Sequence, residues 1–395
     1  MKKSSRASNR TRDLPFAFEE LAKRGHEAAT AQRPAAINSF QGWNGLVFEK
    51  SPRGTKQRIG LQRLDAARDV SAWILSAEHD YRLELPVLET KVIPRPKRSR
   101  AGTRSLALAE PLHHPWNARN YLPTVTAVKE RIARNAKGKR AVFTDPLDAL
   151  LFGPDDRSPY FPSGYPWTCV GRLESTNGSS MGSGAMVGRN LVLTARHVIP
   201  NRSAPLLPAM KFVPGYYQGQ STVGANFFSW VKSTTYYDGD DAGAWDFALL
   251  ELYQPLGDSV GYFGVRTYND DWDDLHVWAA AGYPSMSPFN NQIPSYLLGV
   301  SIYDEDTDGD ASELDSDDQD NSRGNSGGPL WAVWPNGPYM VGVTSANHHT
   351  DYGPFGDDYY VMNAAGKAMV DLVGLARLQI DTTIHVNPPH LDLSG

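Results

Sequence analysis

From residue 141 onward the chain is a succession of short apolar runs, each ended within a few residues by Gly, Pro, Asn or Asp. Many short strands joined by turns are typical of an all-β barrel or sandwich. One amphipathic helix is expected near the end, where apolar residues of 364–378 form one face. The predicted strands lie at 167–173, 184–194, 247–252, 277–282, 296–302 and 340–345.

The first 140 residues differ from the rest in charge. They hold 28 Lys and Arg against 13 Asp and Glu, a net charge of +15, whereas residues 141–395 hold 11 against 31, a net charge of −20. Such an asymmetry predicts two units: a basic, small mixed α/β N-terminal region (1–140) and an all-β domain (141–395). Within the first unit we expect an unstructured start at 1–35, helices at 59–80 and 121–136, a strand at 81–93 and a linker at 94–104.

Several classes of protein are excluded by what the sequence lacks. No apolar run approaches 18 residues, so no membrane-spanning helix is expected. The lone cysteine, Cys169, cannot form an intrachain disulfide or a thiolate zinc cluster. No glycine-rich phosphate loop follows a predicted strand, which leaves nucleotide chemistry without support.

Three short segments carry the residue types of nucleophilic catalysis. The string Gly324-Asn-Ser-Gly-Gly-Pro places Ser326 in a turn that side chains do not obstruct. Because serine is a weak nucleophile, it needs an adjacent base, and His197 at the end of an apolar strand is the candidate. Asp246, directly before another apolar strand, would orient that imidazole. The amides of Gly324 and Ser326 would form an oxyanion hole.

The same segments resemble the motifs of the chymotrypsin-like serine proteases. Thr194-Ala-Arg-His197 is similar to T-A-x-H, Asp246-Phe-Ala-Leu-Leu to D-x-A-L-L, and Gly324-Asn-Ser-Gly-Gly-Pro329 to G-[DN]-S-G-G-P. Residues 151–157 and Tyr165-Pro-Trp167 look more narrowly like the start of the mature domain in the bacterial glutamyl endopeptidase branch.

The resemblance, which covers about 142–378, implies two six-stranded antiparallel β-barrels, a site in the cleft between them and a C-terminal helix. It implies that Ser326 is the nucleophile, His197 the general base and acid, and Asp246 the orienting carboxylate, with no cofactor needed. In position, 1–140 resembles a pro-region, and the basic run that ends at Arg140 predicts processing there. The family is secreted, but 1–10 shows no signal peptide, so a cytoplasmic location is the alternative.

Two preferences at the cleaved bond stay open. In the glutamate-cleaving branch a histidine follows the strand that lines the primary pocket; here Thr344, followed by Ser345, takes that place. Asp320 stands six residues before Ser326, the spacing at which trypsin-type enzymes place the aspartate that binds lysine or arginine. Cleavage after Glu or Asp and cleavage after Lys or Arg are both compatible with these residues.

An acidic segment upstream of Ser326 is a candidate calcium loop. It reads D-x-D-x-D-G-D with Gly309 at the turning position, which matches the oxygen-ligand spacing of such loops. A basic partner could also neutralise the segment, or it could remain a solvated acidic loop. The candidate ligands are Asp304, Asp306, Asp308, Asp310 and Asp315.

Two functions from different classes follow. In the first, the chain is a serine endopeptidase acting on proteins or peptides, and 1–140 is a segment that docks on the acidic protease domain and controls it. In the second, 1–140 is a permanent protein- or nucleic-acid-binding module of an intracellular, partner-triggered effector. Nucleic acid is the less favoured partner, because no stacking motif accompanies the basic charge.

Overall fold

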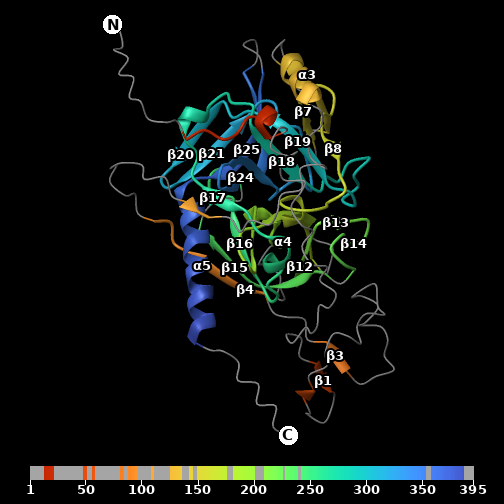
Figure 1. Ribbon diagram of the computed structural model, residues 1–395, viewed down its shortest axis with the longest axis vertical. Coiled ribbons are helices and arrows are strands. Elements are labelled where there is room, and N and C mark those ends of the chain that lie inside the picture. The colour runs from red at the N-terminus through yellow and green to blue at the C-terminus, as the bar shows by residue number, and fades with distance from the viewer. Residues whose placement is uncertain are drawn as a thin grey trace.

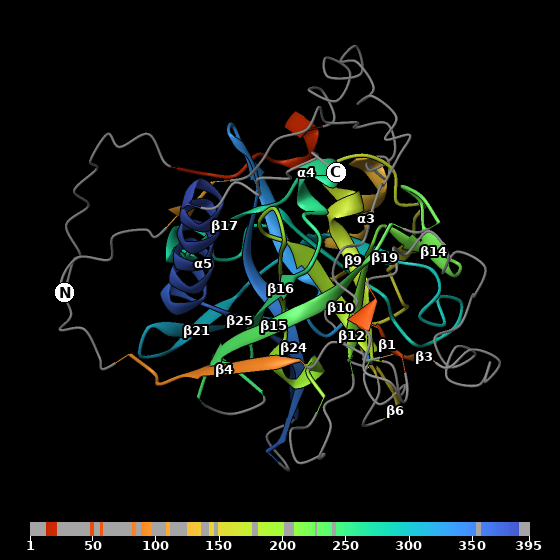
Figure 2. The ribbon, with the colours of Figure 1, turned by 90° about the horizontal axis from the view of Figure 1, so that it is seen from below.

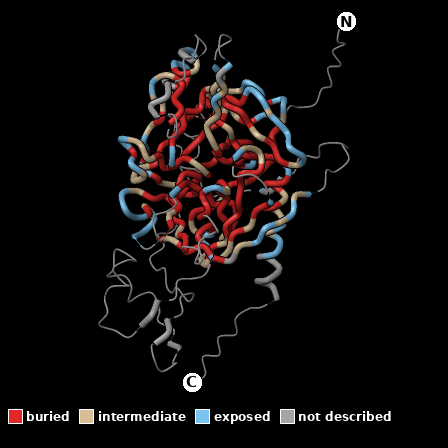
Figure 3. Tube along the Cα trace, turned by 180° about the vertical axis from the view of Figure 1, so that it is seen from behind, coloured by how far each residue is buried: buried red, intermediate tan, exposed pale blue. Residues whose placement is uncertain are grey.

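The computed structural model describes residues 13–21, 48–50, 56–57, 81–83, 88–96, 108–110, 125–135, 142–145, 149–175, 181–200, 209–225, 227–238, 242–352 and 357–386. Strands dominate these residues and two main sheets form the body of the molecule (Figure 1). Buried segments gather in the centre of the molecule, with exposed segments around them (Figure 3). The expected mostly-β architecture with a C-terminal helix is confirmed.

The first sheet closes into an antiparallel barrel of six strands. Its order is β12-β9-β10-β11-β16-β15, and β15 pairs again with β12. The strands are β9 (Val170–Ser175), β10 (Met181–Met186), β11 (Leu191–Thr194), β12 (Met210–Pro214), β15 (Ser229–Tyr237) and β16 (Ala248–Leu252).

The second sheet follows the order β20-β21-β25-β24-β23-β18-β19-β8. The backbone N–H of Tyr303 donates to the carbonyl of Asp315 at 3.0 Å, which brings the chain after β19 to β21. No ladder joins those two strands among the described residues, so this half is a sheet rather than the second closed barrel that was expected. Its strands are β8 (Ser158–Pro159), β18 (Trp278–Gly282), β19 (Ser295–Val300), β20 (Asp304–Asp308), β21 (Ala311–Ser316), β23 (Pro329–Trp334), β24 (Gly337–Asp351) and β25 (Asp357–Ala365).

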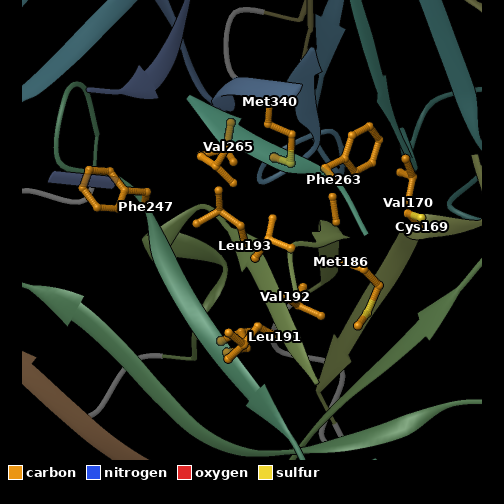
Figure 4. Close-up of a cluster of buried hydrophobic side chains, with 14 of the residues drawn as sticks. Cys169, Val170, Met186, Leu191, Val192, Leu193, Phe247, Phe263, Val265 and Met340 are labelled. Atoms are coloured by element: carbon orange, nitrogen blue, oxygen red, sulfur yellow. The ribbon is translucent and has the colours of Figure 1, made fainter. Parts of the chain in front are cut away.

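One hydrophobic core joins the two sheets. Figure 4 shows Leu193 of the barrel facing Val265 of the second half, with Met340 beyond it, and all three belong to one cluster of buried side chains. Cys169 is fully buried in this core, where burial raises the pKa of its thiol well above the usual range. Since apolar burial contributes about 25 cal/mol per Å², packing of this kind holds the fold together without a disulfide.

The C-terminal helix α5 (Lys367–Val386) begins close to the predicted 364–378 and runs further. Its first turns bury Met369, Leu372 and Val373. Arg377 then donates from Nε to the carbonyl of Val187 at 2.6 Å, in the loop after β10, which fixes the helix to the barrel. Among the described residues, no helix has the length and apolar character that a membrane crossing requires.

Parts of the N-terminal region extend both main sheets. β4 (Glu89–Ile93) pairs in parallel with β15 (Figure 2), and β5 (Leu108–Ala109) pairs with β17 (Gly264–Arg266), which in turn pairs with β24. The expected single strand at 81–93 is therefore two strands in different sheets, since β3 (Tyr81–Leu83) pairs with β1 (Phe48–Lys50), the partner of β2 (Lys56–Gln57). The helix predicted at 59–80 lies outside the described residues.

Residues 13–21 differ from the expectation that 1–35 lacks structure. The N–H of Phe16 donates to the carbonyl of Val333 at 2.8 Å. Phe18 and Leu21 are buried, and together with Trp167 and Leu298 they line a small apolar pocket. Residues 16–21 thus pack directly on the second sheet.

The helix predicted at 121–136 is present as α3 (Val125–Asn135), and it carries a buried arginine. Arg131 donates from Nε to the carbonyl of Leu298 at 3.1 Å and from Nη1 to the carbonyl of Asp318 at 3.0 Å. Its Nη2 lies 3.8 Å from the fully buried carboxylate of Asp318.

The remaining elements are short. They are β6 (Val142–Asp145), β7 (Ala149–Leu151), β13 (Tyr216–Tyr217), β14 (Gln220–Ser221), β22 (Asn321–Ser322), α4 (Gly257–Val260) and the 3₁₀ turns η3 (Trp167–Cys169), η4 (Arg196–Val198) and η5 (Asp270–Trp272).

Candidate active site

The ends of two neighbouring barrel strands bring His197 and Asp246 together. Thr194, the last residue of β11, pairs with Ala248, the first residue of β16. The residues after β11 and before β16 therefore lie at the same end of the barrel. Nδ1 of His197 lies 2.7 Å from Oδ2 of Asp246, and the backbone N–H of His197 donates to Oδ1 at 2.9 Å.

Ser345 completes the surroundings of this carboxylate. Its Oγ donates to Oδ2 of Asp246 at 2.6 Å and accepts the N–H of Gly243 at 3.3 Å. Asp246 is fully buried, and a buried carboxylate is costly unless its oxygens accept hydrogen bonds. The sequence assigned Ser345 to substrate binding, whereas its hydroxyl here holds Asp246 against His197.

Ser326 lies in the turn between β22 and β23. Its carbonyl accepts the N–H of Ser183 in β10 at 2.8 Å, and the next N–H, that of Gly327, donates to the carbonyl of Thr344 at 2.7 Å. Gly327 has φ +78°, and a Cβ there would overlap Oγ1 of Thr194. The turn is thus pressed against the end of β11 and needs glycine at this position.

A glycine of β10 separates the Ser326 turn from the His197 turn. A Cβ on Gly182 would meet the carbonyl oxygen of Ser326 at 3.1 Å and the methyl groups of Val198, the neighbour of His197, at 2.8 Å. The structure therefore brings the segments of all three sequence-predicted residues, His197, Asp246 and Ser326, to one region beside the start of β10.

The turn also orients two amide groups. The carbonyl of Arg323 accepts the N–H of Ser285 at 2.7 Å, and the carbonyl of Asn325 accepts that of Gly328 at 2.8 Å. In a trans peptide the N–H points opposite to the carbonyl of the same unit, so the N–H groups of Gly324 and Ser326 point away from these partners. Neither amide donates a hydrogen bond within the described residues, so both are available to an oxyanion.

Asp320 does not have the open surroundings expected of an aspartate that binds a lysine or arginine of the substrate. It is almost fully buried; Oδ1 accepts the N–H of Phe152 at 2.8 Å, and Oδ2 accepts that of Asp156 at 2.7 Å. Burial raises the pKa of Asp320 to about 6, although the two amides lower it. Both oxygens hold the 152–156 loop, which follows β7, the strand that pairs with β22.

Thr344 is buried in an uncharged network behind the Ser326 turn. Its N–H donates to the carbonyl of Gly328 at 2.9 Å, and its Oγ1 accepts Nε2 of Gln319 at 3.1 Å. Gln319 in turn accepts Nδ2 of Asn363 at 3.0 Å. Thr344, which stands where the glutamate-cleaving branch has a histidine, thus bonds to a backbone carbonyl and to a side-chain amide.

The acidic segment folds as a hairpin of β20 and β21, not as the sequential calcium-binding loop that was one of the alternatives. Asp308 leaves the candidate ligand set, because its Oδ2 accepts Nη1 of Arg95 at 3.0 Å and Nε1 of Trp245 at 2.8 Å. Carboxylate oxygens of Asp304, Asp306 and Asp315 do gather, within 4.8 Å of one another, a cluster that does not include Asp310. Burial, with the neighbouring acids, raises the pKa of Asp315 to about 8.

Ser183 is a residue of the site that sequence reasoning missed. Besides its N–H bond to the carbonyl of Ser326, its Oγ donates to the carbonyl of Gly324 at 2.7 Å and accepts the N–H of Tyr283 at 2.9 Å. These contacts support both ends of the 324–326 turn. A serine between two glycines of an ordinary strand gave no signal of this role.

Comparisons with known proteins identify the family of this chain. The family model described as Trypsin matches residues 157–359, just over half of the 395-residue chain. A curated relative, the glutamyl endopeptidase of Bacillus licheniformis, is 32% identical over 218 residues, which cover 51% of this chain and 64% of the relative. The chain thus spans less than two thirds of the length of that relative.

Solved structures of similar proteins include two proteases. A Glu endopeptidase in complex with MPD has 20% sequence identity and a TM-score of 0.45, and the match covers 57% of this chain and 98% of that one. The protease Anisep from Arthrobacter nicotinovorans has 22% identity and a TM-score of 0.39, with 53% and 93% covered. Given the length of the family match and the expected motifs within it, the chain belongs to the trypsin family of chymotrypsin-like serine proteases.

Proposed function

We propose that this protein is a serine endopeptidase. Ser326 Oγ attacks the carbonyl carbon of the scissile peptide bond while His197 Nε2 removes its proton. The bond to the leaving amine then breaks as His197 returns that proton, which leaves an acyl group on Ser326. Water, deprotonated by His197, hydrolyses the acyl-enzyme. The amides of Gly324 and Ser326 stabilise the oxyanion of both tetrahedral intermediates.

The observation that carries this proposal is the bonding of Asp246. Its Oδ2 lies 2.7 Å from Nδ1 of His197, while Oδ1 accepts the backbone N–H of the same residue at 2.9 Å. The proton of the neutral imidazole is thereby kept on Nδ1, and Nε2 is left as the base. A histidine with a purely structural role would not need a buried carboxylate to select the tautomer that frees Nε2.

A peptide-library digest by the full-length chain, with and without calcium, tests the activity. We expect internal peptide bonds to be cleaved. A fluorophosphonate should form a covalent adduct that peptide mapping places on Ser326. Intact chains that neither cleave any library member nor take up the phosphonate would contradict the proposal.

For the cleaved bond we propose a preference for acidic over basic side chains. Both oxygens of Asp320 accept backbone N–H groups, so this carboxylate is not available to a lysine or arginine of the substrate. The residues that bond behind the Ser326 turn, Gln319, Thr344 and Asn363, carry no charge. The relative from Bacillus licheniformis is named a glutamyl endopeptidase.

The variant Asp320→Asn distinguishes a preference for Glu and Asp at the cleaved bond from a preference for Lys and Arg. If Asp320 only supports the 152–156 loop, the ratio of cleavage after Glu and Asp to cleavage after Lys and Arg should stay within about twofold of the wild-type ratio. Stability should fall by about 1–3 kcal/mol, because the amide NH₂ would face a backbone N–H donor. Library digestion and urea unfolding measure the two quantities. Selective loss of cleavage after Lys and Arg would instead assign Asp320 to the substrate.

We also propose that 1–140 remains an integral part of the enzyme, which favours the permanent-module hypothesis over a segment that leaves. β4 extends the barrel and β5 extends the second sheet. Arg131 places its Nη2 3.8 Å from the buried carboxylate of Asp318 in the protease domain. The chain around the predicted processing point, Arg140, lies outside the described residues. Intact-mass analysis would show whether that bond is cut, and gel filtration whether the two pieces stay together.

Arg131→Met tests this role of the N-terminal region. Removing one partner of a buried ion pair leaves the other charge uncompensated, which costs about 3–5 kcal/mol. We expect the free energy of unfolding in urea to fall by about 3 kcal/mol, with His276, 3.4 Å from the Asp318 carboxylate, reducing the loss. Lys129→Met is the matched control, since Lys129 is an exposed residue of the same helix. Equal, small losses in both variants would contradict the proposal.

A further inference from the structure

The hairpin of β20 and β21 gathers carboxylates on one face. Its register pairs Asp304 with Asp315 and Asp306 with Glu313. Alternate residues of a strand share a face, so these four side chains project to the same side. Carboxylate oxygens of Asp304, Asp306 and Asp315 lie within 4.8 Å of one another. Two oxygens that bind one Ca²⁺ at about 2.4 Å are at most about 4.8 Å apart, so the cluster fits around a single ion.

Asp315 is the member of the cluster that points to a ligand. Its residue surface is only 3% exposed, and Oδ1 has no hydrogen-bond partner within the described part of the chain. Asp304 and Asp306 are exposed and face it across the hairpin. Buried carboxylates in proteins are hydrogen-bonded, paired with a cation or bound to a metal. Among the described residues, no lysine or arginine pairs with any of the three acids.

We propose that Asp304, Asp306 and Asp315 bind a divalent cation of the calcium type, with water filling the remaining coordination positions. Calcium accepts six to eight oxygen ligands in flexible geometry, which suits a site with one buried and two exposed carboxylates. The ligands come from two paired strands. The site therefore differs from a sequential calcium loop, in which Asp308 and Asp310 would also bind.

A bound ion would rigidify the hairpin of β20 and β21, which packs against the loop before Asp246. Glu313, in the same hairpin, lies against Gly243, where an added Cβ would be 2.7 Å from Oε2. The carbonyl of Gly243 accepts the N–H of Asp246 at 3.1 Å, and its own N–H donates to Ser345. By holding β20 and β21 together, the ion would also hold residues 243–246, the loop before β16, in place. We therefore expect its first measurable effect to be a higher thermal stability of the protein.

Terbium luminescence of full-length protein carrying Ser326→Ala tests the site without self-digestion or any dependence on proteolysis. Tyr303 directly precedes Asp304, and its backbone N–H donates to the carbonyl of Asp315 at 3.0 Å, so we expect its ring to sensitise Tb³⁺ in the cluster. We expect a saturable Tb³⁺ signal that Ca²⁺ displaces, with a dissociation constant for Ca²⁺ of about 10⁻⁴ M. Saturating Ca²⁺ should raise Tm by several degrees.

Asp304→Asn and Asp306→Asn should each lower the affinity for Ca²⁺ at least about tenfold, since each removes one of three charged ligands. Both positions are exposed, so these variants should fold; Asp315→Asn supplies the buried comparison. Asp310→Asn, in the turn of the same hairpin, is the matched control and should bind normally. Absence of Tb³⁺ luminescence and of a Ca²⁺-dependent Tm, or unchanged binding by the Asp304 and Asp306 variants, would overturn the proposal. Equal loss in the Asp310 variant would point to a sequential loop and also overturn it.

Discussion

Ser326→Ala should lower kcat by about 10⁶-fold and abolish the fluorophosphonate adduct. The change removes the only atom that can form the acyl-enzyme, while the backbone that shapes the turn is untouched: the carbonyl of residue 326 still accepts from Ser183, and Gly327 still donates to Thr344. Activity that remains would come from the oxyanion donors and from substrate binding. Initial rates on the best library peptide measure the loss.

Ser259→Ala is the control for that substitution, because Ser259 belongs to α4, outside the three segments to which we assign catalysis. It should leave kcat, KM and phosphonate labelling unchanged. The thermal unfolding of both variants should match that of the starting protein, which separates lost chemistry from lost folding. Substantial cleavage by the Ser326 variant would remove Ser326 from the role of nucleophile.

Asp246→Asn should lower kcat by about 10⁴-fold with a much smaller change in KM. An asparagine has one acceptor, and the backbone N–H of His197, at 2.9 Å from Oδ1, requires it. The NH₂ group then faces Nδ1 of His197 and donates to it. That contact moves the ring proton to Nε2, so the imidazole can no longer accept the proton of Ser326.

The matched control is Asp258→Asn, which breaks an exposed ion pair with Arg189 and should leave the rate unchanged. An Asp246 variant that loses less than tenfold in kcat would show that the buried carboxylate does not select the tautomer. A loss that appears in KM alone would assign Asp246 to substrate binding.

The three segments to which we assign catalysis can be recognised in the sequence because each one is local. A strand that runs into His197, an acid that precedes a strand and a glycine-bounded Ser326 can all be recognised within about eight residues. The roles of Asp320 and Ser345 could not be found in that way. Asp320 accepts an amide 168 positions earlier in the chain, and Ser345 bonds to a carboxylate 99 positions earlier.

The acidic segment illustrates a different limit. Acids at 304, 306 and 308 match the first ligands of a calcium loop, but the same spacing of two is also the period of a strand. Only the register with β21 shows that Asp315 joins the cluster, and only the contacts of Arg95 and Trp245 show that Asp308 leaves it. The sequence of 1–140 shows its basic charge and predicts part of its secondary structure, including the helix α3. It gave no sign that β4 and β5 would join the sheets of the other half.

The pairing of β4 with β15 also constrains the order of events on the ribosome. Thr90 and Thr234, which are partners in this pairing, are 144 residues apart in the chain. At about 5–20 residues per second, β4 leaves the ribosome roughly 7–30 s before its partner has been synthesised. During that interval its edge is unpaired, and an unpaired strand edge is prone to aggregation. Production of this protein should therefore respond to translation speed and to chaperone supply more strongly than that of a relative whose barrel strands all follow one another closely.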